Sequence, residues 1–204
     1  MKTPIIAKSA GLAAGLLLLA ACATTTQVLN EWRNADGAGT RFGHFVVVAL
    51  CKQDQTRRMF EDEFAWQISN QGQMVTRSYN LVLGLNENTA SQIPTIARAV
   101  GADGVLVIRL LKRKQDARIA AGNLPPVPIN LPEFLQYAWQ DNYDPPGVPT
   151  NAVMIVESSL FNAKSGKLFW TLAMEVNNQL GLKWEINLLA KRVLGKLKDA
   201  LRTK

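Results

Sequence analysis

Histidine, the side chain most used in acid–base catalysis, occurs once in the sequence, at His44. Any Ser-His-Asp or Cys-His mechanism in this chain would need that imidazole. His44 precedes an apolar segment and has no nucleophile motif beside it. A histidine-based metal site would need a second histidine or a cysteine cluster, and the sequence supplies neither. We therefore expect no catalytic residue, no metal and no other cofactor.

Three consecutive carboxylates, Glu61, Asp62 and Glu63, form a second group that could do chemistry. They fall in a segment with helical spacing, where adjacent residues point in different directions and cannot act as an acid–base pair. Arg57 and Arg58 lie one turn earlier. The spacing predicts surface ion pairs between Arg57 and Glu61 and between Arg58 and Asp62, rather than a catalytic dyad.

Aromatic side chains are the third group. Tyr137, Trp139 and Tyr143 fall inside residues 112–150, a long proline-rich segment. Aromatics on such a connection can contact a protein, a glycan or a membrane face. They can equally fold back and cover the sheet. Both interpretations stay open, and the three residues are candidates for contact with a partner or ligand.

A lipid attachment site is the most specific chemistry in the sequence. Leu19-Ala20-Ala21-Cys22 matches the lipobox of bacterial lipoproteins, and Lys2 and Lys8 precede it in a charged leader. The apolar run before Cys22 has about 12 residues, whereas a membrane span needs about 20. A buried first helix is the alternative, but glycines and a threonine run flank the segment. We expect residues 1–21 to be a removed signal peptide and Cys22 to carry lipid.

Ala23 follows the modified cysteine, which favours the outer membrane of a Gram-negative cell, with the protein facing the periplasm. Cleavage of the leader would remove Lys2 and Lys8, so the formal charge of the mature chain would be +5 instead of +7. A periplasmic location excludes nucleic acid as a partner. Anionic lipid or wall polymers remain as partners for a basic surface, and a solvated surface needs no partner at all. Cys51 ends an apolar segment and is interpreted as a small core residue.

The pattern of apolar residues predicts one α/β (α+β) domain with a mixed sheet and about three helices packed on it. The predicted order is β-β-α-β-α-β, then a long loop, then β-β-α. Residues 22–40 are interpreted as a lipid-anchored tether with a short strand at 27–32. Residues 41–204 form the periplasmic domain, with the proline-rich excursion at 112–150. The other predicted strands are 45–50, 73–79, 104–111, 152–161 and 167–176, and the last helix is 184–202.

Capping residues predict where the first two helices begin and end. Asp54 is expected to cap the first and Gly72 to follow it as the C′ residue. Ser91 is expected to cap the second, with Pro94 in its first turn. In the strand 167–176, alternation places a set of apolar residues on one face: Leu168, Trp170, Leu172, Met174 and Val176.

The sequence also resembles a widespread family of uncharacterised Gram-negative outer-membrane lipoproteins. The shared features are Trp32 with the Asp36-Gly37 turn, the strand 45–50, Arg58-x-Phe60-Glu61-Asp62, Ser78-Tyr79, the segment 101–107, and Ser165-Gly166-Lys167-Leu168-x-Trp170. The resemblance implies an α/β domain similar to those of the curli secretion lipoprotein, the Pel polysaccharide lipoprotein, the lipoprotein activator of penicillin-binding proteins and the TolB amino-terminal domain. These act as scaffolds, rings or protein-binding modules, and no catalytic residue carries over.

The expected function is a non-catalytic interaction or assembly module of the cell envelope, with envelope proteins or further copies of the chain as partners. The alternative is a periplasmic small-ligand or glycan-binding protein that uses Tyr137, Trp139 and Tyr143. An enzyme would need convergent polar residues in a pocket.

Overall fold

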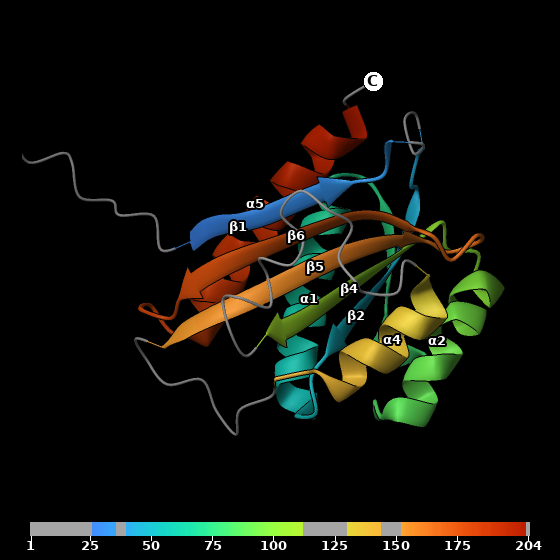
Figure 1. Cartoon of the computed structure of the whole chain (residues 1–204), viewed down its shortest axis with the longest axis horizontal. Helices are drawn as coiled ribbons and strands as arrows, with labels where there is room; N and C mark the ends of the chain where they lie inside the picture. Colours follow the sequence, from blue (N-terminus) through green and yellow to red (C-terminus); the bar gives the residue numbers. More distant parts are fainter. Residues whose placement is uncertain (1–25, 36–39, 112–129, 144–151, 203–204) are drawn as a thin grey trace, which may run out of the picture.

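A six-stranded mixed sheet forms the centre of the protein (Figure 1). The computed structural model describes residues 26–35, 40–111, 130–143 and 152–202. The strand order across the sheet is β1-β6-β5-β4-β2-β3. β2 is parallel to β3 and β4, and the other neighbours are antiparallel. The strands are β1 (Thr26–Arg33), β2 (His44–Leu50), β3 (Met74–Arg77), β4 (Gly104–Leu111), β5 (Val153–Asn162) and β6 (Leu168–Asn177).

Helices pack on both faces of this sheet (Figure 1). α1 (Asp54–Ser69) and α5 (Leu182–Arg202) contribute to one core, and α2 (Glu87–Ala99) and α4 (Leu131–Gln140) to the other. The α/β class, the mixed sheet and the order of the predicted elements are confirmed. Where the sequence indicated about three helices, α4 is an additional one, inside the proline-rich excursion. Residues 112–129 and 144–151 of that excursion lie outside the described residues.

Strand β2, which lies between β4 and the edge strand β3, is buried from both sides, as its unbroken apolar sequence predicted. One set of its residues faces the α1/α5 core: Phe45, Val47 and Ala49. The alternate set faces the α2/α4 core: Val46, Val48 and Leu50. Cys51 is 4% exposed and belongs to the α1/α5 core, which confirms its interpretation as a small core residue.

The ends of α1 differ from the predicted ones. Gln53 is the N-cap residue and makes no side-chain cap hydrogen bond. Asp54 is the first helical residue, and its carboxylate accepts a hydrogen bond from Arg58 Nε at 2.7 Å. At the other end the C-cap is Asn70, so Gly72, with φ of +79°, occupies the C″ position, one residue beyond C′.

α2 begins earlier than predicted, because Asn86 and Thr89 form a capping box. The Asn86 side chain accepts from the Thr89 N–H at 3.0 Å, and Thr89 Oγ1 accepts from the Asn86 N–H at 2.8 Å. This satisfies two backbone donors at the helix start. Ser91, the predicted cap, lies inside α2 and donates to the Asn88 carbonyl at 2.6 Å. Pro94 is therefore in the helix interior rather than in the first turn.

A β-bulge near the start of β6 moves one residue to the other face. Leu160 pairs with Trp170, and Phe161 pairs with Leu168, so Phe169 is the extra residue. Leu168 consequently faces the α2/α4 core, while Trp170 faces the α1/α5 core. The prediction that Leu168 shares a face with the later apolar residues of the strand is wrong, because a bulge shifts the alternation by one position.

Strand β1 forms one edge of the sheet. It corresponds to the short strand predicted at residues 27–32. Side chains as well as backbone pairing hold it: Trp170 Nε1 donates to Glu31 Oε1 at 3.1 Å. Lys196 of α5 lies 3.2 Å from Glu31 Oε2, and Arg192 donates to the Thr26 carbonyl. The leader 1–21 and residues 22–25 and 36–39 of the expected tether lie outside the described residues.

The capping box generates a test that separates the two possible starts of α2. Asn86→Ala should lower the free energy of unfolding by about 1 kcal/mol, because a donor at the helix start loses its acceptor. Ser91→Ala should change it by less than about 0.5 kcal/mol, since Ser91 caps nothing. Urea denaturation of both variants checks this, and a larger loss for Ser91→Ala would show that α2 begins where the sequence placed it.

Candidate functional site

The single histidine has a structural contact. His44 is the first residue of β2, it is half-buried, and its Nε2 lies 2.9 Å from Thr76 Oγ1 on the neighbouring strand β3. The backbone N–H of His44 donates to Asp103 Oδ2 at 3.1 Å. Within the described ranges, no group of three or more His, Cys, Asp or Glu side chains is arranged to hold a metal ion.

Glu61 is buried, so the prediction of a surface pair with Arg57 is wrong. Both side chains are at most 1% exposed, and Arg57 Nε lies 3.0 Å from Glu61 Oε1. Glu61 Oε1 also accepts from Ser78 Oγ at 2.6 Å and from the Ala49 N–H at 3.1 Å. Glu61 Oε2 accepts from the Tyr79 N–H at 3.0 Å. One carboxylate therefore joins α1 to β2 and to the 3-10 turn η2 (Ser78–Asn80).

Asp62 pairs with the edge strand β3, so the prediction of an Arg58–Asp62 pair is wrong. Asp62 lies 2.6 Å from Arg77 Nε of β3 and accepts from the Tyr79 hydroxyl at 2.5 Å. Burial raises the pKa of Tyr79, and the hydrogen bond from its neutral hydroxyl to Asp62 raises it further. The guanidinium of Arg58 lies over the Tyr79 ring, 4.5 Å from its centroid. Arg58 also donates a hydrogen bond to the Asp54 carboxylate, which lowers the pKa of Asp54.

Glu63 bridges the two helices of its layer. Its Oε1 accepts from Gln67 at 3.0 Å and from Asn187 of α5 at 2.6 Å. The three adjacent carboxylates thus serve a buried network, an edge strand and a helix pair. This agrees with the expectation that they form no acid–base dyad.

Helix α4 carries two of the three predicted aromatic contacts. Asn130 caps it by accepting from the Glu133 N–H at 3.1 Å, and the Leu131 N–H donates to the Gly166 carbonyl of the β5–β6 hairpin at 2.7 Å. Its inner side is buried against the sheet and α2 through four residues: Leu131, Phe134, Leu135 and Ala138.

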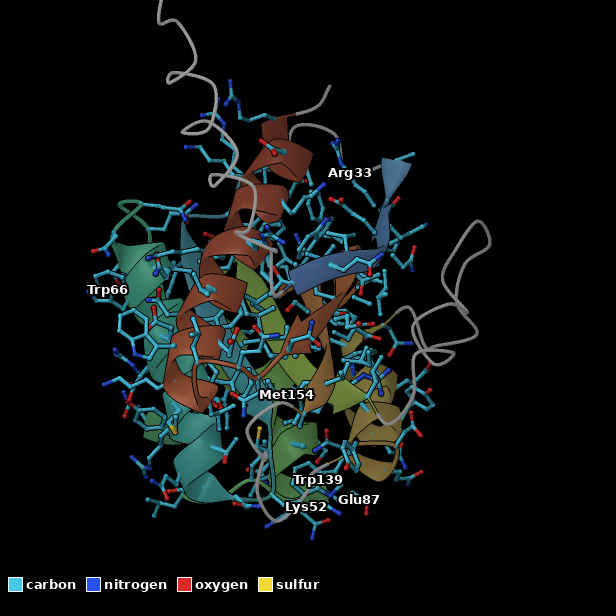
Figure 2. All side chains as sticks on the ribbon, turned by 90° about the vertical axis from the view of Figure 1, so that its left-hand side faces the viewer. Arg33, Lys52, Trp66, Glu87, Trp139 and Met154 are labelled. Carbon is cyan, nitrogen blue, oxygen red and sulfur yellow. The ribbon has the colours of Figure 1, made fainter. Side chains whose placement is uncertain are left out.

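The structure places Tyr137 and Trp139 on different sides of α4. Tyr137 is 36% exposed and lies over the Arg109 guanidinium at 5.1 Å. Trp139 is partly buried against the α2/α4 core, and in Figure 2 it lies near Glu87 at the start of α2. Tyr143 follows the helix, is 41% exposed, and donates its backbone N–H to the Leu110 carbonyl at 3.2 Å. Tyr137 and Tyr143 thus remain available for contact, whereas Trp139 has partly folded back.

Beneath α4 lies a buried ion pair that the sequence analysis missed. Arg109 of β4 is 3% exposed and faces Glu157 of β5, with two nitrogen–oxygen distances of 3.3 Å. Burial acts to lower the pKa of Arg109, but the charge of Glu157 and its hydrogen bond outweigh this and raise it. Ser159 Oγ donates to Glu157 at 3.2 Å and lies 2.8 Å from Thr171 Oγ1. The sequence did contain a signal for this pair, because Arg109 is the one charged residue in the otherwise apolar strand β4.

Pockets among the described residues include the following three. One of about 210 Å³ lies beside the β5–β6 hairpin, and one of about 340 Å³ lies between the C-terminal ends of α1 and α5. The third, of about 360 Å³, lies at the N-terminal end of α1. Cys22, the predicted lipid site, is outside the described residues. No helix in the described part of the chain is long and apolar enough to cross a membrane.

No protein-family model and no curated protein matches the sequence. Among solved structures, the chain is similar to the PelC dodecamer from Paraburkholderia phytofirmans, with 13% identity, 88% of this chain and 99% of that chain covered, and a TM-score of 0.44. A variant of that dodecamer matches with 15% identity, 85% and 98% coverage, and a TM-score of 0.44.

Lipoprotein GNA1162 from Neisseria meningitidis matches with 12% identity, 78% of this chain and 99% of that chain covered, and a TM-score of 0.43. The Pel polysaccharide lipoprotein, named above for its similar α/β domain, is thus among the structures similar to this chain. At these identities the likeness concerns the fold.

The buried position of Glu61 can be tested against its exposed neighbour. Glu61→Gln should lower the free energy of unfolding by about 3 kcal/mol, because Arg57 would keep a buried charge without its counter-ion. Asp62→Asn should cost less than about 1 kcal/mol, because the carboxylate of Asp62 is half exposed. Urea denaturation measures the free energy of unfolding of both variants. Equal losses would show that Arg57 and Glu61 form a surface pair, as the sequence predicted.

Proposed function

We propose that the protein is a non-catalytic, lipid-anchored lipoprotein of the outer membrane that acts in the periplasm as an interaction or assembly module. The lipobox-like sequence before Cys22 supports the anchor, and Ala23 supports the outer membrane. Three of the described polar side chains that could do chemistry have structural partners: His44 contacts Thr76, Glu61 pairs with Arg57, and Arg109 pairs with Glu157. This use of the polar groups favours a role in binding over one in catalysis.

The observation that carries the proposal is a pair of exposed tryptophans on one helical layer. Trp66 of α1 is 53% exposed and Trp184 of α5 is 66% exposed. Both helices bury their other sides in the same core, and Trp66 projects from the side of the molecule in Figure 2. Tryptophan is strongly enriched among the residues that dominate protein–protein interfaces. The outer face of α1 and α5 is therefore the proposed contact surface for an envelope protein or a second copy of the chain.

The alternative function, binding of a small ligand or glycan, is supported by the exposure of Tyr137 and Tyr143 next to the charged Arg109. It uses the opposite face of the sheet from Trp66 and Trp184. Variants on the two faces can therefore distinguish the two functions.

The anchor is tested by replacing its cysteine. Wild-type protein should fractionate with the outer membrane and have the mass of an acylated chain that begins at residue 22. Cys22→Ala should lose the lipid and the membrane association, because the thiol of Cys22 is the proposed point of lipid attachment. A wild-type protein that keeps residues 1–21 and carries no lipid would overturn the anchor and the proposed location.

The contact surface is tested by crosslinking in intact cells. Trp66→Ala and Trp184→Ala together should reduce capture of envelope partners or of a second copy at least about tenfold, because truncation of a hot-spot tryptophan costs about 2 kcal/mol or more. Their stability should change little, because both side chains are exposed. The matched control replaces Tyr137, Trp139 and Tyr143 by Ala. Loss of capture only in this control favours the ligand-binding alternative, and a hydrolase activity abolished by a point mutation would overturn the non-catalytic role.

A further inference from the structure

The pocket at the N-terminal end of α1 is distinct from both surfaces described above. Trp66 lies in the last turn of the same helix, at its opposite end. The pocket has a volume of about 360 Å³. Its charged lining comes from the loop between β2 and α1 and from the first two turns of α1: Lys52, Asp54, Arg57 and Arg58. The loop that leads to α2 contributes the apolar side chains of Leu83 and Leu85.

Arg57 lines this pocket and has one donor without a hydrogen-bond partner. The side chain is 1% exposed, its Nε donates to Glu61 at 3.0 Å, and its Nη2 donates to Ser78 at 2.8 Å. In the structure as described, its Nη1 is buried and has no hydrogen-bond partner. Buried donors without an acceptor are rare, because the lost hydration is not replaced. Glu61 and Ser78 hold the guanidinium in place, so Nη1 is the nitrogen left to serve a ligand.

The charges around Arg57 favour an anion. Lys52, Arg57 and Arg58 line the pocket together with one carboxylate, Asp54, which Arg58 engages at 2.7 Å. Glu61 lies behind Arg57 and offsets one of the positive charges. The start of α1 adds a partial positive charge and free backbone donors, and Gln53 supplies no side-chain cap there.

We propose that this pocket binds a phosphate group, with Arg57 Nη1, Lys52 and the first turn of α1 as its donors. A phosphate carries several acceptor oxygens and can accept from a guanidinium, an ammonium and backbone N–H groups at once. The apolar side chains of Leu83 and Leu85 would contact the organic part of a phosphomonoester, and Leu83 is 95% exposed at the rim. That phosphomonoester can be a free compound or the headgroup of a lipid.

The test follows backbone amide NMR signals during titration with inorganic phosphate at constant ionic strength. Saturable shifts are expected at the amides of Asp54, Gln55 and Thr56. Lys52→Gln is the variant of choice, because Arg57 also belongs to the buried Glu61 network. It should weaken binding about tenfold, the effect of losing one charge-assisted hydrogen bond. Lys191→Gln removes the same charge from the exposed side of α5 and should change the affinity less than about twofold, because salt screens distant charges.

A second arm identifies the source of the phosphate. The Cys22→Ala protein, which lacks the proposed lipid site, is sedimented with phosphatidylcholine vesicles with and without phosphatidic acid. Retention that needs phosphatidic acid and is lost in Lys52→Gln assigns the site to a lipid headgroup. Saturable phosphate binding without such retention assigns it to a free compound. The proposal is overturned if the first turn of α1 shows no saturable shift, or if Lys52→Gln and Lys191→Gln weaken binding equally.

Discussion

The buried carboxylate of Glu61 connects three elements that the chain brings together from different places. It accepts hydrogen bonds from the backbone of β2, from Arg57 of α1, and from Ser78 and Tyr79 in η2. A buried charge is tolerated only when its partners compensate for the water it has lost. Any slide of α1 along the sheet would break several of these bonds together, so the position of the helix is tightly specified. The same bonds end β3 after Arg77, because the chain must turn at Ser78 to reach Glu61.

This network also decides what the rest of α1 is free to do. Because Glu61 and the apolar residues of α1 face inward, Trp66 remains on the outside, where it is available to a partner. Because Glu61 and Ser78 hold two nitrogens of Arg57, the third is left in a fixed orientation beside a pocket. The proposed contact surface and the proposed phosphate site are therefore two consequences, at opposite ends of one helix, of the same buried ion pair.

On the opposite face, the Arg109–Glu157 pair has a similar role for α4. The two side chains come from adjacent antiparallel strands, and Arg109 also lies against the rings of Phe134 and Tyr137. The guanidinium thus supports one side of α4 from below, while Trp139 packs on the α2 side. This arrangement separates the aromatic residues that the sequence places close together, and it leaves Tyr137 and Tyr143 as the exposed ones.

The amino-acid sequence by itself determined the α/β class, the order of the predicted elements and the burial of β2, because these follow from local periodicity and from apolar runs. It also contains the lipobox-like site at Cys22, which is recognised from four consecutive residues without knowledge of the fold. It could not distinguish a surface pair from a buried one at Arg57 and Glu61, since the spacing of four residues is the same in both. It could not reveal the bulge at Phe169, the capping of α2 by Asn86, or the different sides taken by Tyr137 and Trp139. Only the tertiary structure decided these, because each depends on which distant backbone or side chain arrives next to the residue when the sheet and its two helical layers pack together.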